Sequence, residues 1–388
     1  MMEKVRLGDI CNILNGYAFK SSEYKESGIR VIRITNVQSG YIEDKDPKYY
    51  SFEKKTEIEK YMLKDNDILI SLTGNVGRVG LLKREMLPAA LNQRVACIRI
   101  KENKKISINY VFNILNTKKF LKQCEINSKG IAQKNLSTEW LKNYLIDIPD
   151  FIEQAEISNK LDKVQEITNM RKKQIDELDK LIKSQFVEMF GIPFLNEKRW
   201  KMGTIRDLVS EVKYGTSKPA DGGKYKYLRM NNIAYDGNLD LNDIKHINIS
   251  EDETEKYTTK KGDILFNRTN SRDLVGKTCV FNLEEKMVIA GFIIRVRVND
   301  LATPYFISTY LNTIYLKNKL YNMCKNASGQ SNINAQELQN IEIYIPPIDL
   351  QNKFADFVKA IDKQKLETQK SLEETQKLQD SLMNKYFS

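Results

Sequence analysis

The chain has 388 residues, of which 62 are lysine or arginine and 51 are aspartate or glutamate, so its formal net charge is +11 at pH 7. This length allows two or three domains with separate cores, and the positive charge favours an anionic partner, either nucleic acid or an acidic membrane surface. The five cysteines are scattered and His246 is the only histidine, which argues against histidine-dependent metal sites and Ser-His-Asp triads. No apolar run approaches the roughly 18 residues of a membrane-spanning helix, so we expect a cytoplasmic protein with reduced thiols.

Residues 1–150 combine short strand-like runs with one helical segment. The runs are "RVIRI" from Arg30, "DILISL" from Asp67 and "VACIRI" from Val95, and residues 108–124 have a helical pattern. Turns rich in glycine and asparagine separate these runs. The pattern predicts a globular domain that mixes strands and helices.

A single long helix is predicted for residues 151–192, because no proline or glycine interrupts the sequence before Gly191 and Pro193. Its apolar residues follow the 3.5-residue spacing of a coiled coil. The predicted seam contains Ile157, Leu161, Val164, Ile175, Leu178, Ile182 and Met189.

The second half of the chain repeats the first. Asp-Ile-Leu occurs at 67–69 and at 263–265, and Arg33 and Asn36 match Arg229 and Asn232, all 196 residues apart. The repeat predicts a second globular domain at 193–348 and a second long helix at 349–388. The seam of that helix contains Phe354, Val358, Ile361, Leu372 and Leu382.

The two long helices are expected to pair with each other. Both seams become polar at the same place, Thr168 and Arg171 in one helix and Lys365 and Thr368 in the other. Antiparallel pairing would give the chain an internal pseudo-two-fold axis and place the globular domains at opposite ends. The alternative is two solvated helices with weak amphipathicity.

The stretch "NSRDLVGKT" at 270–278 resembles a nucleotide-binding P-loop, but Ser271 stands where the opening glycine belongs. In the first copy the matching stretch has Arg78 in the place of Lys277, and Val79 where a magnesium-binding hydroxyl is required. The two copies share a polar turn that ends in glycine and one cation. This pattern favours a surface for phosphates and base edges over a nucleotide site.

Other catalytic motifs are weak. Asp207, Glu211 and Lys213 faintly resemble a nuclease site, but their spacing is short and the first copy has Ile13 and Asn15 at the latter two positions. Surface charges are the simpler interpretation. We therefore predict no catalytic residues and no metal site in this chain.

Two further motifs are duplicated, and they carry a family resemblance. Each copy has a glycine followed by an asparagine and a hydrophobic residue, and then Ile-Pro-x-x-x-x-Gln ending at Gln154 and Gln351. With the repeat architecture, this order resembles the specificity subunit of type I restriction–modification systems over essentially the whole chain. The resemblance implies an α+β fold with two similar target recognition domains, separated by two long helices paired as an antiparallel coiled coil.

The same resemblance implies a function. Each recognition domain would read one half of a split, asymmetric double-stranded DNA site, and the helices would serve as a spacer and a docking surface for two methyltransferase subunits. Restriction subunits would join that complex. S-adenosylmethionine, ATP and magnesium would then bind to the partner subunits, so no cofactor is expected on this chain.

Polar residues in the duplicated loops are the candidates for DNA binding, because asparagine and glutamine can bridge adenine and arginine and lysine can bridge guanine. The candidates for base reading are Asn75, Arg78, Asn92, Gln93, Arg94, Asn267, Arg268, Asn270, Arg272 and Lys277. Those favoured for phosphate contacts are Lys20, Lys129, Gln133, Lys134, Lys218, Ser328, Gln330 and Asn332. Arg33 and Arg229 lie inside apolar strands, and their role is left open between the fold and DNA.

Two other classes of function remain as alternatives. A non-catalytic coiled-coil scaffold with a basic surface for acidic proteins would explain the helices and the charge. It would not explain why asparagine, glutamine and arginine gather in matching loops. An ATP-driven DNA enzyme would require nucleotide binding by the isolated chain.

Overall fold

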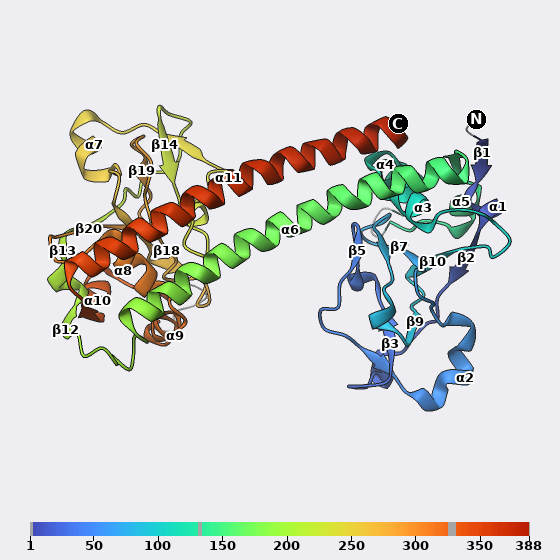
Figure 1. The fold of residues 1–388 in the computed structure, drawn as a ribbon, viewed down its shortest axis with the longest axis horizontal. Coiled ribbons are helices and arrows are strands. Elements are labelled where there is room, and N and C mark those ends of the chain that lie inside the picture. The colour runs from blue at the N-terminus through green and yellow to red at the C-terminus, as the bar shows by residue number, and fades with distance from the viewer. Residues whose placement is uncertain (1–2, 131–133, 325–330, 388) are drawn as a thin grey trace. The chain divides into compact units, whose positions relative to one another are not determined.

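The computed structural model describes residues 3–130, 134–324 and 331–387, and the chain forms two compact units (Figure 1). Unit 1 comprises Met1–Met170 with Leu372–Ser388, and unit 2 comprises Arg171–Ser371. Each unit therefore combines a globular part with one half of each long helix. The sequence predicted boundaries at 1–150, 151–192, 193–348 and 349–388. These boundaries fall near the ends of the long helices, whereas the two compact units divide each long helix between them.

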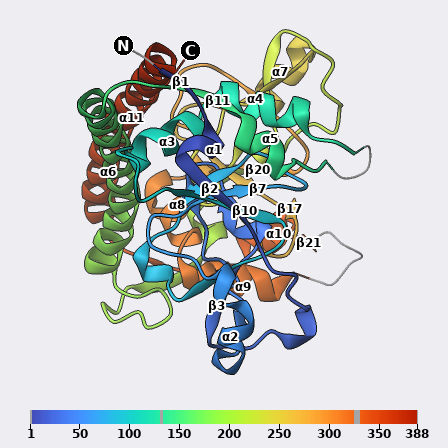
Figure 2. The ribbon, with the colours of Figure 1, turned by 90° about the vertical axis from the view of Figure 1, so that its right-hand side faces the viewer.

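Unit 1 is built around a four-stranded sheet with strand order β2-β10-β7-β8, part of which faces the viewer in Figure 2. A three-stranded sheet, β6-β3-β9, contains a parallel pair, and two smaller sheets pair β1 with β11 and β4 with β5. The strands are β1 (Glu3–Arg6), β2 (Cys11–Asn15), β3 (Ile29–Ile32), β4 (Val37–Gln38), β5 (Tyr41–Ile42), β6 (Tyr49–Tyr50), β7 (Ile68–Ser71), β8 (Val79–Leu81), β9 (Ala89–Leu91), β10 (Val95–Ile100) and β11 (Leu145–Ile148).

Unit 2 repeats the main sheets of unit 1 in the same strand order, but it has the β17–β21 pair in place of the β4–β5 pair. Its four-stranded sheet has the order β13-β20-β16-β18, its three-stranded sheet is β15-β14-β19, and β12 pairs with β22. The strands are β12 (Lys201–Thr204), β13 (Val209–Tyr214), β14 (Tyr225–Leu228), β15 (Lys245–Ile247), β16 (Ile264–Asn267), β17 (Thr269–Asn270), β18 (Thr278–Val280), β19 (Val288–Ile289), β20 (Ile293–Val298), β21 (Ser331–Asn332) and β22 (Glu342–Ile345).

Short capped helices cover the sheets. The side chains of Ser107, Thr117 and Ser137 each accept a hydrogen bond from a backbone N–H in the first turn of the helix that follows. This N–H has no acceptor within its own helix, so the cap satisfies it. The short helices are α1 (Leu7–Ile10), α2 (Lys55–Ile58), α3 (Ile108–Leu115), α4 (Lys118–Asn127), α5 (Thr138–Asn143), α7 (Glu251–Tyr257), α8 (Pro304–Leu311), α9 (Ile314–Met323) and α10 (Ala335–Gln339).

The alternation of side chains along the central strands creates a core on each face of the sheet. In β7, Ile68 and Ile70 pack toward the helices, while Leu69 packs toward the three-stranded sheet. In β16, Ile264 and Leu265 divide between two cores in the same way. Strands in which consecutive side chains are apolar, such as β7 and β16, are therefore buried on both faces.

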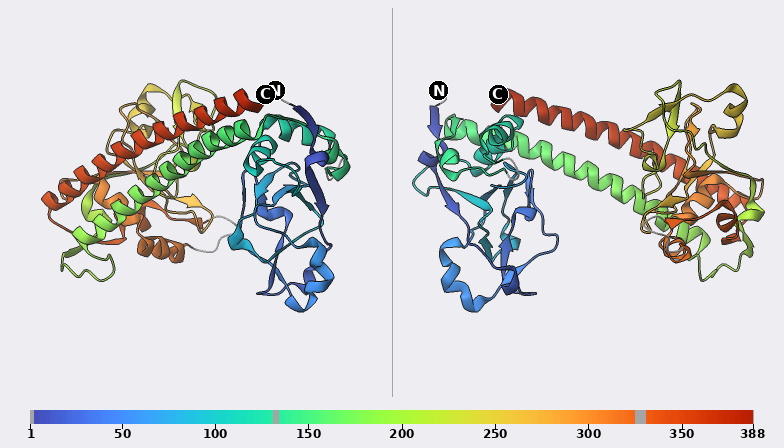
Figure 3. Two further views of the ribbon diagram at one scale, coloured as in Figure 1. Left: turned by 45° about the vertical axis from the view of Figure 1, so that its right-hand side comes forward. Right: turned by 180° about the vertical axis from the view of Figure 1, so that it is seen from behind.

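The two long helices, α6 (Phe151–Phe190) and α11 (Ile348–Phe387), run antiparallel within each unit (Figures 1 and 3). In unit 1 the start of α6 shares a core with the end of α11, where Ile157 and Leu161 pack with Leu382. In unit 2 the ring of Phe354 at the start of α11 lies 5.4 Å, between centroids, from that of Phe190 at the end of α6. The predicted antiparallel pairing is confirmed.

The burial pattern of the two helices agrees with the predicted coiled-coil seams, while a docking role of these residues stays a prediction. Each predicted residue of either seam is buried or half-buried, while the residues between them are largely exposed. The heptad spacing missed Phe186, which is fully buried beside Phe190 and Phe354. Among the residues that the structure describes, no helix is long and apolar enough to cross a membrane.

Candidate DNA-binding surface

In unit 2, three segments that are distant in the sequence meet at the end of β16. The backbone N–H of Arg268 donates to the carbonyl of Phe292, and the N–H of Ile333 donates to the carbonyl of Arg268, both at 2.9 Å. The short strand β17 pairs with β21, and the Thr269 hydroxyl donates to Asn332 Oδ1 at 3.0 Å. The fold thus gathers the predicted loops into one surface.

Unit 1 builds the same junction with the same hydrogen bonds. The N–H of Leu72 donates to the carbonyl of Arg94 at 3.0 Å, and the N–H of Leu136 donates to the carbonyl of Leu72 at 2.8 Å. Thr73 and Asn135 form an isolated β-bridge at the position of the β17–β21 pair. In each unit the segment that contains the duplicated asparagine, Asn135 or Asn332, is therefore held against the loop that follows β7 or β16.

The glycines of the P-loop-like stretch are explained by close packing. Gly77 and Gly276 have φ angles of +83° and +77°. A Cβ atom would lie 2.7 Å from Cys124 Cβ at Gly77, and 2.5 Å from Leu320 Cδ1 at Gly276. Only glycine allows the loop to adopt this backbone conformation and to approach α4 or α9 this closely.

The cation and hydroxyl of that stretch face the protein interior. Lys277 is 7% exposed, and its Nζ donates to the carbonyl of Met230 at 2.9 Å. Thr278 is fully buried and begins β18, whereas a P-loop leads into a helix whose N-terminus binds phosphate. The stretch connects two strands and is not built as a nucleotide site.

Two lysines stabilise this loop from inside. Lys317 of α9 donates from Nζ to the carbonyl of Gly276 at 2.6 Å and lies over the ring of Tyr235. Burial, with smaller contributions from Lys277 and Lys183, lowers the pKa of Lys317 to about 7. Burial also lowers the pKa of Lys277. Both amines occupy weakly hydrated positions, which suits a role in holding the loop.

The structure divides the predicted DNA-binding residues by exposure. Asn267 is fully buried, like the amino group of Lys277, so the prediction that these two side chains contact DNA directly is wrong for this conformation. Arg78, Asn92, Arg268, Asn270 and Arg272 are half-buried. The exposed ones are Lys20, Asn75, Gln93, Arg94, Lys129, Lys134, Lys218 and Asn332, while Gln133, Ser328 and Gln330 lie outside the described residues.

Some exposed and half-buried candidates already have partners within the chain. Lys218 forms an ion pair with Glu253 at 2.7 Å, and this bond is the largest cause that lowers the pKa of Glu253 to about 2. Arg78 donates to Gln38 Oε1 at 2.8 Å. Their binding to DNA stays a prediction, and it would require these contacts to be exchanged for contacts with DNA.

Two arginines of the unit 2 loop are held over tyrosine rings, which the sequence reading missed. The guanidinium of Arg268 lies 4.8 Å from the ring centroid of Tyr214, and that of Arg272 lies 4.1 Å from that of Tyr321. An aromatic face restricts the guanidinium without pairing its charge, so both arginines are ordered cations. No sequence signal beside the loop pointed to these contacts, because Tyr214 lies in β13 and Tyr321 lies in α9.

The open question about Arg33 and Arg229 is answered by matching contacts. Arg33 Nη2 donates to the carbonyl of Asp46 at 2.6 Å, and Arg229 Nη2 donates to the carbonyl of Asp243 at 2.8 Å. The duplicated Asn36 and Asn232 are buried, and each side-chain oxygen accepts from the backbone N–H of its arginine at 2.9 Å. These four residues stabilise the turn after β3 and after β14.

The duplicated glutamines join the globular part of each unit to its long helix. Gln351 accepts from the Thr303 N–H at 3.0 Å and donates to the carbonyls of Leu301 and Pro346 at 3.0 and 2.9 Å. Gln154 accepts from the Ser107 N–H and donates to the carbonyl of Pro149, both at 2.9 Å. The Ile-Pro-x-x-x-x-Gln motif is therefore a structural joint.

The nuclease-like residues are engaged in structural contacts. Asp207 accepts from the backbone N–H of Thr204 at 2.7 Å as a helix cap. Glu211 forms ion pairs with the buried Arg295 at 2.5 Å and with Lys213 at 2.6 Å. Among the described side chains, no group of three histidine, cysteine, aspartate or glutamate residues is placed to hold a metal ion.

The sequence model of the type I restriction modification DNA specificity domain matches residues 1–180 and again residues 197–377. The EcoBI specificity subunit of Escherichia coli is 23% identical over 382 residues, which cover 90% of this chain and 77% of that protein. The EcoKI specificity subunit of Escherichia coli strain K12 is 23% identical over 362 residues, which cover 87% of this chain and 77% of that protein.

Solved structures agree on the fold. The crystal structure of the S subunit of a type I restriction–modification system from M. genitalium matches with a TM-score of 0.60 at 15% identity, and the match covers 100% of this chain and 96% of that one. A chain from a structure of a type I R-M system matches with a TM-score of 0.56 at 18% identity, covering 100% and 97%. With two copies of the domain along its length, the chain belongs to the family of type I restriction–modification DNA specificity proteins.

Proposed function

We propose that this chain reads a bipartite, asymmetric double-stranded DNA target, with one half-site bound by each globular part. The observation that carries the proposal is the pair of matching junctions at the ends of β7 and β16. Both use the same backbone hydrogen bonds but present different side chains, such as Asn75 and Arg94 in one unit and Arg268 and Arg272 in the other. One scaffold with two sets of base-reading residues fits two unlike half-sites.

The chain acts as a targeting subunit and is not catalytic by itself. The net charge of +11 supports binding to the phosphate backbone, and the two long helices provide the surface on which two methyltransferase subunits dock. Restriction subunits complete the assembly, and S-adenosylmethionine, ATP and magnesium bind to those partners.

Exchange of one globular part tests the proposal. Residues 1–149 are replaced by the matching part of a relative with a different target, and the methylated sites of a host carrying the complex are mapped by sequencing. One half of the modified site should change and the other should stay the same. A change in both halves, or in neither, would contradict the assignment of one half-site to each unit. Sequence-independent binding would favour the scaffold alternative.

A further inference from the structure

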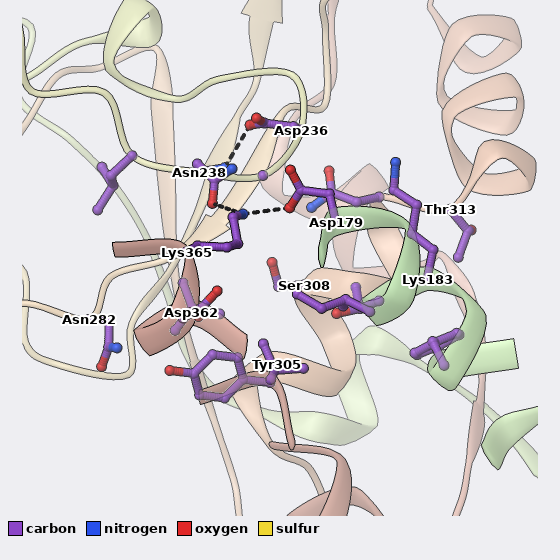
Figure 4. A pocket seen from close by; sticks show the side chains of 18 of the residues that line it. Asp179, Lys183, Asp236, Asn238, Asn282, Tyr305, Ser308, Thr313, Asp362 and Lys365 are labelled. Carbon is purple, nitrogen blue, oxygen red and sulfur yellow. Dashed lines mark hydrogen bonds and ion pairs between the residues drawn. The ribbon is translucent and has the colours of Figure 1, made fainter. Parts of the chain in front are cut away.

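The large exposed apolar side chains of unit 2 include two separate groups. One group, which contains Ile314 and Leu366, lines a cavity of about 970 Å³ between α6, α11, α8 and the loop around Asn238 (Figure 4). The other group is Phe292, which is 48% exposed, and Leu274, which is 40% exposed, and both lie in the segments that form the candidate DNA-binding surface. Single exposed apolar residues are common on proteins, so their surroundings decide what these two can bind.

Phe292 lies directly opposite Arg268. The N–H of Arg268 donates to the carbonyl of Phe292 at 2.9 Å, which extends the antiparallel pairing of β16 with β20 by one residue beyond Asn267 and Ile293. Asn267 and Ile293 are fully buried, so the alternation of side chains turns Arg268 and Phe292 to the opposite face. Opposite residues of an antiparallel pair have Cβ atoms about 4.5–5.5 Å apart. The side chains of this arginine and this phenylalanine therefore leave the strands side by side.

Arg268 is restrained beside the exposed ring. Its guanidinium lies 4.8 Å from the ring centroid of Tyr214, and the Tyr214 hydroxyl accepts from the N–H of Ala335 at 2.8 Å. The tyrosine ring orders the arginine without neutralising its charge. An ordered cation next to an exposed apolar ring fits DNA, because one groove of the duplex presents phosphates, polar base edges and methyl groups together.

Unit 1 has a different arrangement at the same place. There the N–H of Leu72 donates to the carbonyl of Arg94 at 3.0 Å, so Leu72 matches Arg268 and Arg94 matches Phe292. Leu72 is 6% exposed, whereas Arg94 is exposed. The cationic and the apolar residue have thus exchanged places, and only unit 2 exposes the apolar one.

The loop after β16 differs from its counterpart in the same way. Leu274 matches Asn75 at an offset of 199, and both side chains are exposed. Unit 1 therefore presents polar side chains at two positions where unit 2 presents apolar ones. Because both units share the backbone hydrogen bonds of the junction, this difference changes what the surface can contact while its framework stays the same.

The major groove of B-DNA offers one apolar group to such side chains, the C5-methyl group of thymine. Arginine reads guanine through O6 and N7, which lie in the same groove. Neighbouring base pairs are about 3.4 Å apart along the helix axis, so two side chains with Cβ atoms about 5 Å apart can reach adjacent base pairs. The pair formed by Arg268 and Phe292 matches a thymine on the base pair next to a guanine.

We propose that Phe292 reads a thymine in the half-site of unit 2, by contact of its ring with the C5-methyl group, on the base pair next to a guanine that Arg268 contacts. This inference rests on the proposed function and names a base within it. Unit 1 has no equivalent contact at the matching place, because Arg94 stands there and Leu72 is buried. Dependence on this methyl group therefore belongs to one half of the target.

Replacement of thymine by deoxyuridine tests the contact, because it removes only the methyl group and keeps every hydrogen-bonding group of the base pair. The target is first read from the methylated sites of the host, and its unit 2 half is assigned by the exchange of residues 1–149. Thymines of that half are then replaced one at a time in a synthetic duplex, and binding of the assembled complex is measured by competition. One replacement should lower the affinity about fourfold, which corresponds to about 0.8 kcal/mol for one methyl group removed from water.

Variants of Phe292 connect this effect to the ring. Phe292→Ala should lower the affinity for the thymine duplex and abolish its preference over the deoxyuridine duplex, whereas Phe292→Leu should keep part of the preference because leucine still offers an apolar contact. Arg94→Ala is the matched control, which should weaken binding through the other half-site and leave the preference for thymine in the unit 2 half as it is. Melting curves of all three variants establish that each is folded.

Three results would overturn the proposal. They are a unit 2 half-site without an A·T pair next to a G·C pair, equal affinity for thymine and deoxyuridine at every position, and an equal loss on both duplexes in Phe292→Ala, which would mean that the ring stacks on bases or supports the fold. A host without bipartite methylated sites would refute the proposed function as well. A bipartite site that does not respond to deoxyuridine would refute only this contact.

Discussion

Replacement of Gln351 by leucine should selectively destabilise unit 2. Leucine has a similar volume, but it leaves the Thr303 N–H and the carbonyls of Leu301 and Pro346 without the partner that Gln351 provides. At about 1 kcal/mol for each hydrogen bond, the free energy of unfolding should fall by about 3 kcal/mol. For a unit of this size the melting temperature should fall by roughly 6–12 °C.

The two tryptophans allow the units to be followed separately, because Trp140 lies in unit 1 and Trp200 lies in unit 2. Fluorescence melting of Gln351→Leu is measured in backgrounds that carry Trp140→Phe or Trp200→Phe. Gln154→Leu is the matched control, since Gln154 makes two such bonds and its loss should lower the stability of unit 1 by about 2 kcal/mol.

A joining role for Gln351 requires that its loss destabilises unit 2 more than unit 1. If Gln351→Leu shifts both tryptophan transitions equally, or shifts the Trp200 transition by less than about 0.5 kcal/mol, the glutamine does not join the globular part of unit 2 to α11.

Further predictions concern the loops of unit 2. Arg268→Ala and Arg272→Ala should each weaken DNA binding by about 1–3 kcal/mol and relax base preference in one half-site only, which competition binding with substituted duplexes would measure. An equal loss of affinity for all DNA sequences would indicate phosphate contacts instead. Lys277→Met should lower the thermal stability of unit 2 without altering base preference, and a changed preference with normal stability would contradict its assignment to the interior. Gly276→Ala should destabilise unit 2 by roughly 1–3 kcal/mol, because the residue has a positive φ and lies against Leu320, and normal melting would refute that reasoning. The lowered pKa of Lys317 means that the unfolded chain binds a proton between about pH 7 and 10.5 that the folded chain does not, so the stability of unit 2 should rise with pH across this window. Lys317→Met should flatten the rise in urea unfolding, and the same slope in both proteins would exclude this lysine as its cause.

The sequence predicted features that depend on local pattern and on the repeat. The α+β domains, the two long helices and the heptad positions of their seams follow from the residue spacing, because an antiparallel pair buries the same face along most of its length. The repeat also implied that matching residues of the two copies occupy matching places, as the two junctions do.

Other features depend on contacts that spacing does not encode. Lys277 stands in a polar loop, yet its amino group turns inward to the carbonyl of Met230, a residue 47 positions earlier in the sequence. Phe186 falls outside the heptad positions because the helix end packs into the globular core. The tyrosines beneath Arg268 and Arg272 come from a strand and a helix that are distant in the sequence, so no local motif predicted these contacts.

The central claim is that each globular part reads its own half-site. The most direct test is a chain in which residues 201–346 are replaced by the matching residues 3–149, so that the same recognition part occurs twice. Sequencing of the methylated host genome should then show a target with two identical half-sites, both equal to the half that unit 1 reads in the parent protein. A target that keeps the original second half would contradict the account, because recognition would then not reside in the part that was exchanged.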